Sequence, residues 1–406
     1  MKTSKIACVS CKQARVPSRR WCALGVCWLL SLSQVAEAAP QSGRLVGWGQ
    51  RMTPTPGTVV TNIGVGNEET LGIQSDGTLL SWGELEMDLP LIGAPGEYME
   101  IHFAMPIGLS NVVAVAISKD MLDGHAVALR ADGSVFAWGD NRYGQTNVPE
   151  GLFNVRAVAA GGVHCLALNG DGTVVAWGAN GAGQTNVPAG LTNVVAIAAA
   201  ASSSLAVTAQ GTVVAWGDNT FGQTNVPPGL SNVVAIAAGW DHCLALKADG
   251  TVVGWGDNAH GEINVPIGLS NVVALAAGGG DTHPPYSGFD GHSLALKSDG
   301  TVVAWGKDNY GQPDVPAGLS NAIAIAAGAE CSLALQKDGT VVGWGHNSAG
   351  QTMMPPQLGN VLAVADVGQQ TIVLKQEGTL ANWGSDYFGG AAPPKGLSNV
   401  VAITPQ

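Results

Sequence analysis

Four histidines of the 406-residue sequence could serve as general acid–base groups or as metal ligands. They recur at one place of a repeated segment, as His125, His164, His242 and His292. Ser203 and Cys331 stand at the same place in two further copies. A catalytic histidine is needed once, in a single constellation with its partners. Four copies therefore predict a hydrogen-bonding role in the framework and not a role in catalysis.

Three cysteines, Cys165, Cys243 and Cys331, lie 78 and 88 residues apart at nearly equivalent places of the repeat. Equivalent residues of different repeats are separated in space, so these spacings do not predict a disulfide framework. We expect them to be small buried apolar residues. Cys8 and Cys11 form a Cys-x-x-Cys pair, which lacks the second pair that a zinc site requires.

Asp281, His283 and Asp290 are the best candidates for a metal site, but their spacing matches no standard ligand pattern. The sequence also lacks a nucleophile elbow, a zinc-spaced histidine pair and a phosphate-binding loop. A glycosidase would need two carboxylates in one cleft, and sequence spacing identifies no such pair. We therefore predict no catalytic residue, no resident metal and no cofactor, and we expect that the protein is not an enzyme.

The elements that would position these residues follow from an internal repeat. Trp-Gly occurs nine times, and five of the eight intervals between these tryptophans are 39 residues long. One unit predicts three strands, Asn232–Gly239, His242–Gly250 and Thr251–Gly256, and the second strand has the period of two of a half-buried strand. Asp-Gly between the last two strands is typical of a tight hairpin. A connector of about 15 residues with an internal proline leads to the next unit.

A three-stranded sheet of this size cannot bury both of its faces alone, so neighbouring sheets must pack against it. Sheets repeated around an axis form a β-propeller, which is the all-β fold that we predict. Small residues in the first strand suit the crowded axis, and the tryptophans suit the gaps between three-stranded blades. Eight complete units favour eight blades, with seven and nine as alternatives. The isolated strands Gly43–Gly49 and Asn399–Ile403 would meet and close the ring.

The first 38 residues have the order of a secretory signal peptide, with a basic start, an apolar run from Trp21 to Leu32, and small residues at Ala36 and Ala38. The apolar run of twelve residues is too short to span a bilayer. We expect cleavage after Ala38 and export of a single propeller domain, residues 43–406, to the extracellular space or cell envelope, with no membrane span. The exported chain would carry 12 basic and 29 acidic residues, and this net charge of −17 excludes nucleic acid as an expected partner.

The segment from Val233 to Asn258, VVAIAAGWDHCLALKADGTVVGWGDN, resembles the repeat of the regulator of chromosome condensation family. The 39-residue unit and the connector GDNxxGQTNVP are most similar to the bacterial secreted branch, which includes a β-lactamase-inhibiting propeller. The resemblance extends over about residues 45–404 and implies a β-propeller, with seven blades in the inhibitor branch. Members of the family serve as exchange factors, ubiquitin-ligase parts, inhibitors and adhesins, so the resemblance alone selects no function.

One position of the connector varies while its surroundings repeat. The residue that precedes the connector glycine is Tyr143, Ala182, Phe221, His260, Tyr310, Ala349 and Phe388 in seven units. Trp240, Tyr286, Phe289 and Tyr387 map to the same face of the predicted propeller, as do the loop insertions Ser118–Gly124 and Gly278–Gly291. A residue kept for packing should repeat, and exposed aromatic residues in a polar surround are typical of a protein-binding hot spot. Alternatively, each ring folds over its own loop, or the rings stack on sugars.

These observations predict a secreted, monomeric binding or scaffold protein that recognises an unidentified protein partner through this face. The predicted binding residues are Tyr143, Phe221, Trp240, His260, Tyr286, Phe289, Tyr310, Tyr387 and Phe388. A carbohydrate-binding protein of the cell surface is the alternative that would use the same aromatic residues. A polysaccharide-active enzyme and a specific β-lactamase inhibitor are less favoured alternatives.

Overall fold

The computed structural model describes residues 69–73, 77–83, 85–90, 98–103, 106, 109–118, 124–279, 291–356, 358–367 and 370–384. The chain divides into two compact units, Met1–Gln41 and Ser42–Gln406, and all described residues belong to the second. Every helix or strand assigned in these ranges is a strand, and no helix that could cross a membrane is found there. The predicted leader and the predicted ring-closing strands, Gly43–Gly49 and Asn399–Ile403, lie outside the described residues.

Seven sheets contain three antiparallel strands each. In chain order they are β5 (Val112–Ile117), β6 (His125–Arg130) and β7 (Val135–Gly139); β8 (Val155–Ala160), β9 (His164–Asn169) and β10 (Val174–Gly178); β11 (Val194–Ala199), β12 (Ser203–Thr208) and β13 (Val213–Gly217); β14 (Val233–Ala238), β15 (His242–Lys247) and β16 (Val252–Gly256); β17 (Val272–Ala277), β18 (His292–Lys297) and β19 (Val302–Gly306); β20 (Ala322–Ala327), β21 (Cys331–Gln336) and β22 (Val341–Gly345); β23 (Val361–Val367), β24 (Gln370–Lys375) and β25 (Leu380–Gly384). Two further sheets have two described strands each, β1 (Glu69–Ile73) with β2 (Leu79–Gly83), and β3 (Leu85–Pro90) with β4 (Tyr98–Phe103).

The seven three-stranded sheets confirm an all-β propeller of about seven blades, a number that the sequence leaves open as an alternative to eight. β1 and β2 are the second and third strands of the first repeat unit, and the residues just before β1 lie outside the described ranges. The hairpin of β3 and β4 lies in the lengthened connector that follows Trp82, where we predicted no strand.

The Asp-Gly hairpins form as predicted. In the turn from β9 to β10, Asp171 Oδ1 accepts hydrogen bonds from the backbone N–H of Thr173 (2.9 Å) and from its hydroxyl group (2.7 Å). Gly172 has a φ of +83°, a conformation that strains any residue with a Cβ atom. A Cβ atom at Gly172 would also come within 3.0 Å of the Cα atom of Asn193, which precedes the first strand of the next sheet. The turn therefore determines both the hairpin and its contact with the following unit.

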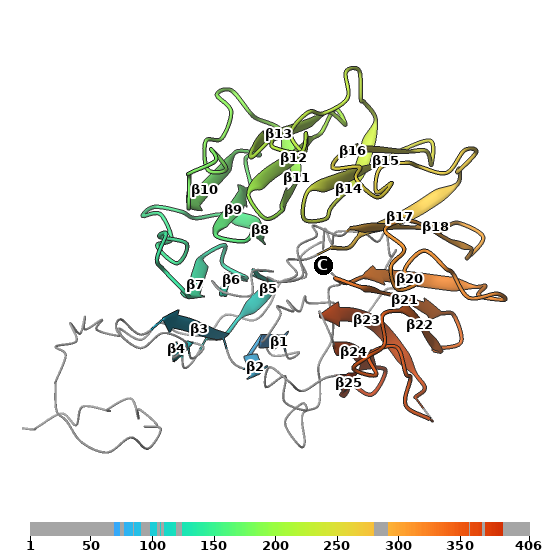
Figure 1. Ribbon diagram of the computed structural model, residues 1–406. Coiled ribbons are helices and arrows are strands. Elements are labelled where there is room, and N and C mark those ends of the chain that lie inside the picture. The colour runs from blue at the N-terminus through green and yellow to red at the C-terminus, as the bar shows by residue number, and fades with distance from the viewer. Residues whose placement is uncertain are drawn as a thin grey trace, which may run out of the picture. The chain divides into compact units, whose positions relative to one another are not determined.

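The sheets follow one another around a centre, with the first strand of each sheet innermost (Figure 1). First strands of successive sheets, such as β8 and β11, contact each other. The hydrophobic core lies between neighbouring sheets, where Leu166 and Val174 of one sheet pack with Ile197 and Trp216 of the next. Trp216 is buried in this layer, so the tryptophans fill the gaps between blades as predicted.

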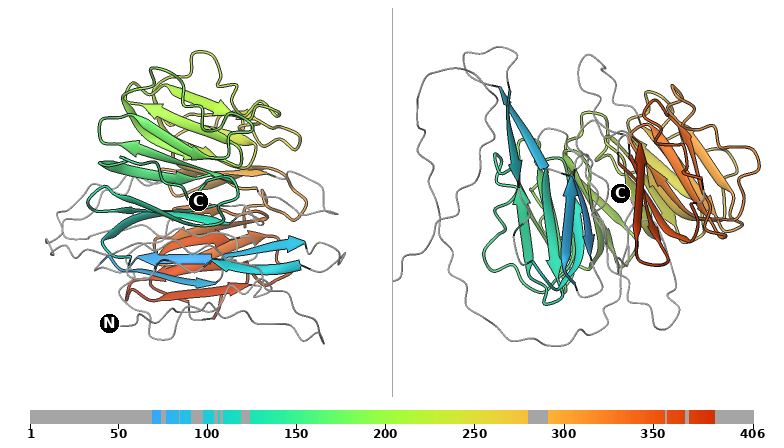
Figure 2. Two further views of the ribbon diagram at one scale, coloured as in Figure 1. Left: turned by 90° about the vertical axis from the view of Figure 1, so that its left-hand side faces the viewer. Right: turned by 90° about the horizontal axis from the view of Figure 1, so that it is seen from below.

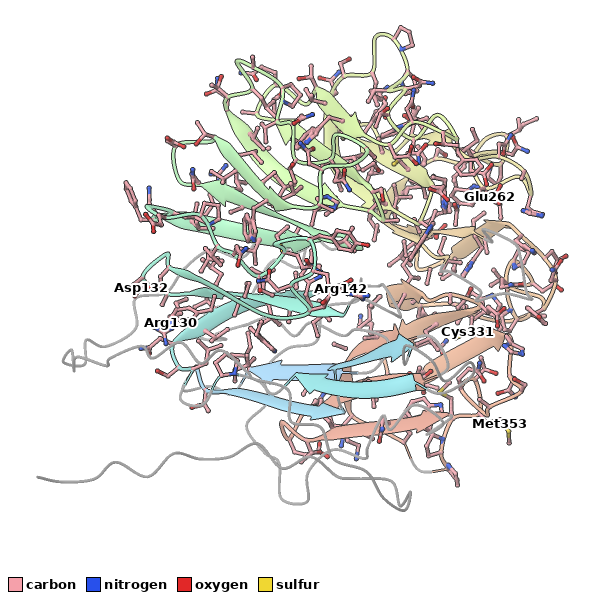
Figure 3. All side chains as sticks on the ribbon, turned by 60° about the vertical axis from the view of Figure 1, so that its left-hand side comes forward. Arg130, Asp132, Arg142, Glu262, Cys331 and Met353 are labelled. Atoms are coloured by element: carbon pink, nitrogen blue, oxygen red, sulfur yellow. The ribbon has the colours of Figure 1, made fainter. Side chains whose placement is uncertain are left out.

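Each sheet has two ends with different roles. Gly178 at the end of β10 pairs with His164 at the start of β9, so the beginning of the connector and the loop between the first two strands lie at the same end. We call the surface formed by these ends the connector face. The Asp-Gly turns lie at the opposite end, and the side views in Figure 2 show the strands running between the two. Figure 3 shows Arg142 at the connector end of the β5–β7 sheet and Arg130 with Asp132 at the other end.

Candidate functional site

The variable residue of each connector is held through its backbone by a buried side chain two residues later. Gln145 Oε1 accepts a hydrogen bond of 2.9 Å from the backbone N–H of Tyr143. The same contact recurs in the other described units, from Ala182 to Gln184, Phe221 to Gln223, His260 to Glu262, Tyr310 to Gln312 and Ala349 to Gln351, at 2.9 to 3.1 Å. All six acceptor residues are at most 3% exposed. The contact uses only the backbone of the variable residue, so its side chain is free to differ.

The same glutamines connect each connector to the next sheet. The backbone carbonyl of Gln184 accepts hydrogen bonds from the indole N–H of Trp216 (2.9 Å) and the hydroxyl of Ser204 (2.8 Å), both in the sheet β11–β13. Trp177 and Trp255 donate in the same way to Gln145 and Gln223, at 2.9 Å each. The recurrent Trp and Gln of the repeat are therefore partners across a blade boundary, and they hold the loop that carries the variable residue.

Three of the four recurrent histidines contact a serine of the next sheet, in agreement with the predicted framework role, whereas His125 faces a sheet that has Cys165 at the serine position. His164 Nε2 lies 2.9 Å from Ser204 Oγ, whose single hydroxyl proton is donated to the carbonyl of Gln184. The serine can therefore only accept from the ring, which requires a proton on His164 Nε2. His242 and His292 contact Ser293 and Ser332 of the next sheet in the same arrangement, at 3.1 and 3.0 Å.

Burial keeps three of the recurrent histidine rings neutral. Loss of solvation lowers the pKa of His125 to about 4, that of His164 to about 3 and that of His292 to about 4. A glycine three residues before the ring makes room for it, since a Cβ atom at Gly161 would come within 2.3 Å of His164 Cε1. A neutral, fully enclosed imidazole that donates to a serine stabilises the blade contact and has no access to a substrate.

The predicted binding residues that the structure describes lie on the connector face. Tyr143, Phe221 and Tyr310 are 53%, 37% and 47% exposed, and His260 is also exposed at the equivalent place. Trp240 is half-buried in the loop between β14 and β15. The other predicted residues, Tyr286, Phe289, Tyr387 and Phe388, lie outside the described ranges, as do the metal candidates Asp281, His283 and Asp290.

Local contacts orient two of these side chains. The Tyr310 ring packs against the His346 ring of the next sheet, with the centroids 4.3 Å apart and the planes 31° from parallel. His260 Nδ1 lies 3.2 Å from Oε1 of the buried Glu262. These contacts orient the two rings, and 47% of Tyr310 and 39% of the His260 side chain stay exposed.

Gln223, which holds the backbone of Phe221, also contacts two acidic residues that the sequence did not single out as a site. Gln223 Nε2 donates to Asp218 Oδ2 at 2.9 Å and to Asp241 Oδ1 at 3.2 Å, so it bridges the sheets β11–β13 and β14–β16. Asp241 is 8% exposed. Burial first, and then the charges of Asp218 and Asp257, raise the pKa of Asp241 to about 7. The only hint in the sequence is that Asp241 stands where most other units have Gly, Val or Ser.

The described residues contain no group of three His, Cys, Asp or Glu side chains that could hold a metal ion. Cys165, Cys243 and Cys331 are buried, as expected, and none of them is in a disulfide among the described residues. Burial raises the pKa of the Cys243 thiol to about 12, so this thiol is protonated and unreactive at neutral pH.

One sequence-family model and several solved structures match the chain. A sequence model of the regulator of chromosome condensation (RCC1) repeat matches residues 123–145, 155–184, 194–223, 233–262, 287–312 and 322–351. No curated protein matches the chain. One similar solved structure is the CRINKLY WD40 ectodomain of the Arabidopsis thaliana receptor kinase ACR4, with a TM-score of 0.51 and 20% identity over 71% of this chain and 99% of that one. Another is Prp20p from Saccharomyces cerevisiae, described with its binding to Gsp1p and histones, with a TM-score of 0.45 and 24% identity over 62% and 77% of the two chains.

Proposed function

Because the chain is an RCC1-type repeat β-propeller, we propose that it is a secreted, non-enzymatic protein that binds a protein partner through its connector face. One observation carries the proposal. Tyr143, Phe221 and Tyr310 stand exposed at a single position whose backbone is fixed in every described unit by a buried Gln or Glu. Rigid aromatic side chains bind with little loss of conformational entropy, and they dominate the energetics of protein interfaces.

The leader-like first 38 residues support the secreted part of the proposal, and the GDNxxGQTNVP connector supports a place in the bacterial secreted branch of the family. The non-enzymatic part is supported by the enclosure of the recurrent histidines in the framework, where no substrate reaches them. The variable position, and not the repeated residues, is then the part of the molecule that selects a partner.

The test is capture of partners from extracellular and cell-envelope fractions, read by mass spectrometry. The chain is compared with a variant that carries Tyr143→Ala, Phe221→Ala and Tyr310→Ala. Phe153→Ala serves as the matched control, because Phe153 is 75% exposed but lies beside Asp171 at the opposite end of the blade.

A protein that is captured by the chain and by the control variant, but not by the triple variant, supports the proposal. Equal capture by all three chains contradicts it. Retention of glycans in place of proteins, lost in the triple variant, would assign the same face to carbohydrate binding. All three chains should stay folded, and the melting temperature of the triple variant should fall only slightly, because it loses the ring contact between Tyr310 and His346.

A further inference from the structure

At the junction between the sheets β17–β19 and β20–β22, four side chains of the connector face have balanced charges. Glu330 precedes β21, and its Oε2 lies 2.6 Å from Nδ1 of His346, which follows β22. The backbone N–H of His346 also donates to the carbonyl of Glu330 at 3.0 Å. Lys307 and Gln312 occupy the other two positions, in the connector of the preceding sheet. A single acid is here accompanied by a lysine and a histidine.

The junction between the sheets β11–β13 and β14–β16 has the same backbone but the opposite charges. The backbone N–H of Asp257 donates to the carbonyl of Asp241 at 2.9 Å, so these two residues correspond to His346 and Glu330. Asp218 corresponds to Lys307, and Gln223 to Gln312. Asp218 and Asp257 therefore stand at the two positions where the equivalent junction has a lysine and a histidine, and Gln223 bridges Asp218 to Asp241.

One carboxyl oxygen at this junction is buried without a hydrogen bond. Asp241 is more than nine-tenths buried, and its Oδ1 accepts from Gln223 Nε2 at 3.2 Å. Its Oδ2 has no hydrogen-bond partner among the residues that the structure describes. A buried carboxylate oxygen without a donor is costly, so it requires a proton or a cation.

We propose that Asp218, Asp241 and Asp257 bind one cationic side chain, a lysine ammonium or an arginine guanidinium, of the protein partner. This inference rests on the proposed function and names the chemistry of one partner group. Gln223, which bridges Asp218 and Asp241, also accepts from the backbone N–H of Phe221, and Trp240 directly precedes Asp241 in the chain. A charge-assisted hydrogen bond to a carboxylate is about twice as strong as a neutral one, and a guanidinium can make two in parallel.

Binding should exchange a proton for the cation. The free site holds a proton on Asp241 near neutral pH, because burial and two neighbouring acids raise its pKa to about 7. An incoming cation favours the ionised form and releases that proton. The titratable groups around Asp241 in the described part of the chain are Asp218 and Asp257 from the flanking connectors and Cys243 on β15. His242, on the same strand, is directed to Ser293 of the next sheet. Affinity should therefore fall about tenfold from pH 8 to pH 6.

The experiment is an NMR titration of the ¹⁵N-labelled chain, followed at the Trp240 indole N–H, which is assigned with Trp240→Phe. The probes are N-acetylarginine methylamide and N-acetyllysine methylamide at constant ionic strength and pH 8. N-acetylcitrulline methylamide is the neutral control, because it has the shape of the arginine probe without its charge. We expect a saturable shift with at least one cationic probe, in the millimolar range, and none with the citrulline probe.

Two matched variants locate the site. The double variant Asp218→Asn with Asp241→Asn should bind the cationic probe at least tenfold more weakly. Glu330→Gln, at the junction with balanced charges, should leave the affinity for the probe unchanged. Equal shifts with the citrulline probe, an affinity that does not depend on pH between 6 and 8, or saturation by Ca²⁺ alone would overturn the proposal. Absence of any shift in the folded parent chain would also overturn it. These outcomes are read without the capture experiment, so a failure of this site can be distinguished from a failure of the proposed function.

Discussion

Acidification from pH 7 to pH 5 should destabilise the propeller through its enclosed histidines. His125, His164 and His292 have folded pKa values of about 4, 3 and 4, against 6.5 in an unfolded chain. The unfolded state therefore binds more protons below pH 6.5, and the stability that the neutral rings contribute is lost as the pH falls toward 4. Between pH 6.5 and pH 5, each ring should cost about 2 kcal/mol of the free energy of unfolding, or about 6 kcal/mol for three independent rings.

Asp241 acts in the opposite direction. Its folded pKa of about 7 is above its unfolded value, so protonation between pH 7 and pH 5 stabilises the fold by about 2 kcal/mol. Exposed turn aspartates such as Asp249, with a pKa of about 2, change their contribution only below about pH 4 and stay outside this window. The two opposing effects leave a net loss of about 4 kcal/mol from pH 7 to pH 5.

Urea unfolding of the chain at pH 7, 6 and 5, followed by tryptophan fluorescence, measures this loss. Asp241→Asn should increase it to about 6 kcal/mol, because the offset disappears. His292→Gln keeps a donor for Ser332 and should decrease it by about 2 kcal/mol. Equal pH dependence in the parent chain and both variants would refute the assignment of these groups.

Three further changes test the frame. Gly161→Ala should cost about 2 kcal/mol, because the new Cβ atom would lie 2.5 Å from the carbonyl oxygen of Ala200, whereas Gly181→Ala, with no atom within 4 Å, should change the melting temperature little. Trp216→Phe should cost about 1 to 3 kcal/mol in urea unfolding, because it removes the 2.9 Å bond to Gln184 and leaves a gap between blades. Glu262→Gln should raise the melting temperature, since it replaces a buried carboxylate with the amide that other units have at this position. A lower melting temperature would show that the contact of Glu262 with His260 outweighs the cost of burying the carboxylate.

The blades could be predicted from the sequence because the same signals recur in every unit. The predicted strand His242–Gly250 and the observed β15, His242–Lys247, begin at the same residue, and the Asp-Gly turn follows as expected. Repetition separates the packing residues from the variable ones, so the position of Tyr143 and Phe221 could also be found. Their role in binding stays a prediction.

Two features could not be read from the sequence. The glutamine of the connector recurs visibly, but its bond to the backbone of a variable residue leaves no pattern of residue types. The cluster of Asp218, Asp241 and Asp257 forms across a blade boundary, and only the packing of neighbouring sheets brings its members together. Neither the hydrophobic period nor the turn residues of the sequence predict a contact between two different blades.

The buried glutamine also affects how this protein can change over generations. Because Gln145, Gln184 and Gln223 bind only the N–H of the variable residue, tyrosine, alanine and phenylalanine occupy the same place in three successive units. A single codon change can therefore exchange one contact of the face without refitting the core. Duplication of a unit adds another such place with its anchor already present. The fold can therefore be inherited unchanged while the residues of the connector face change, one blade at a time.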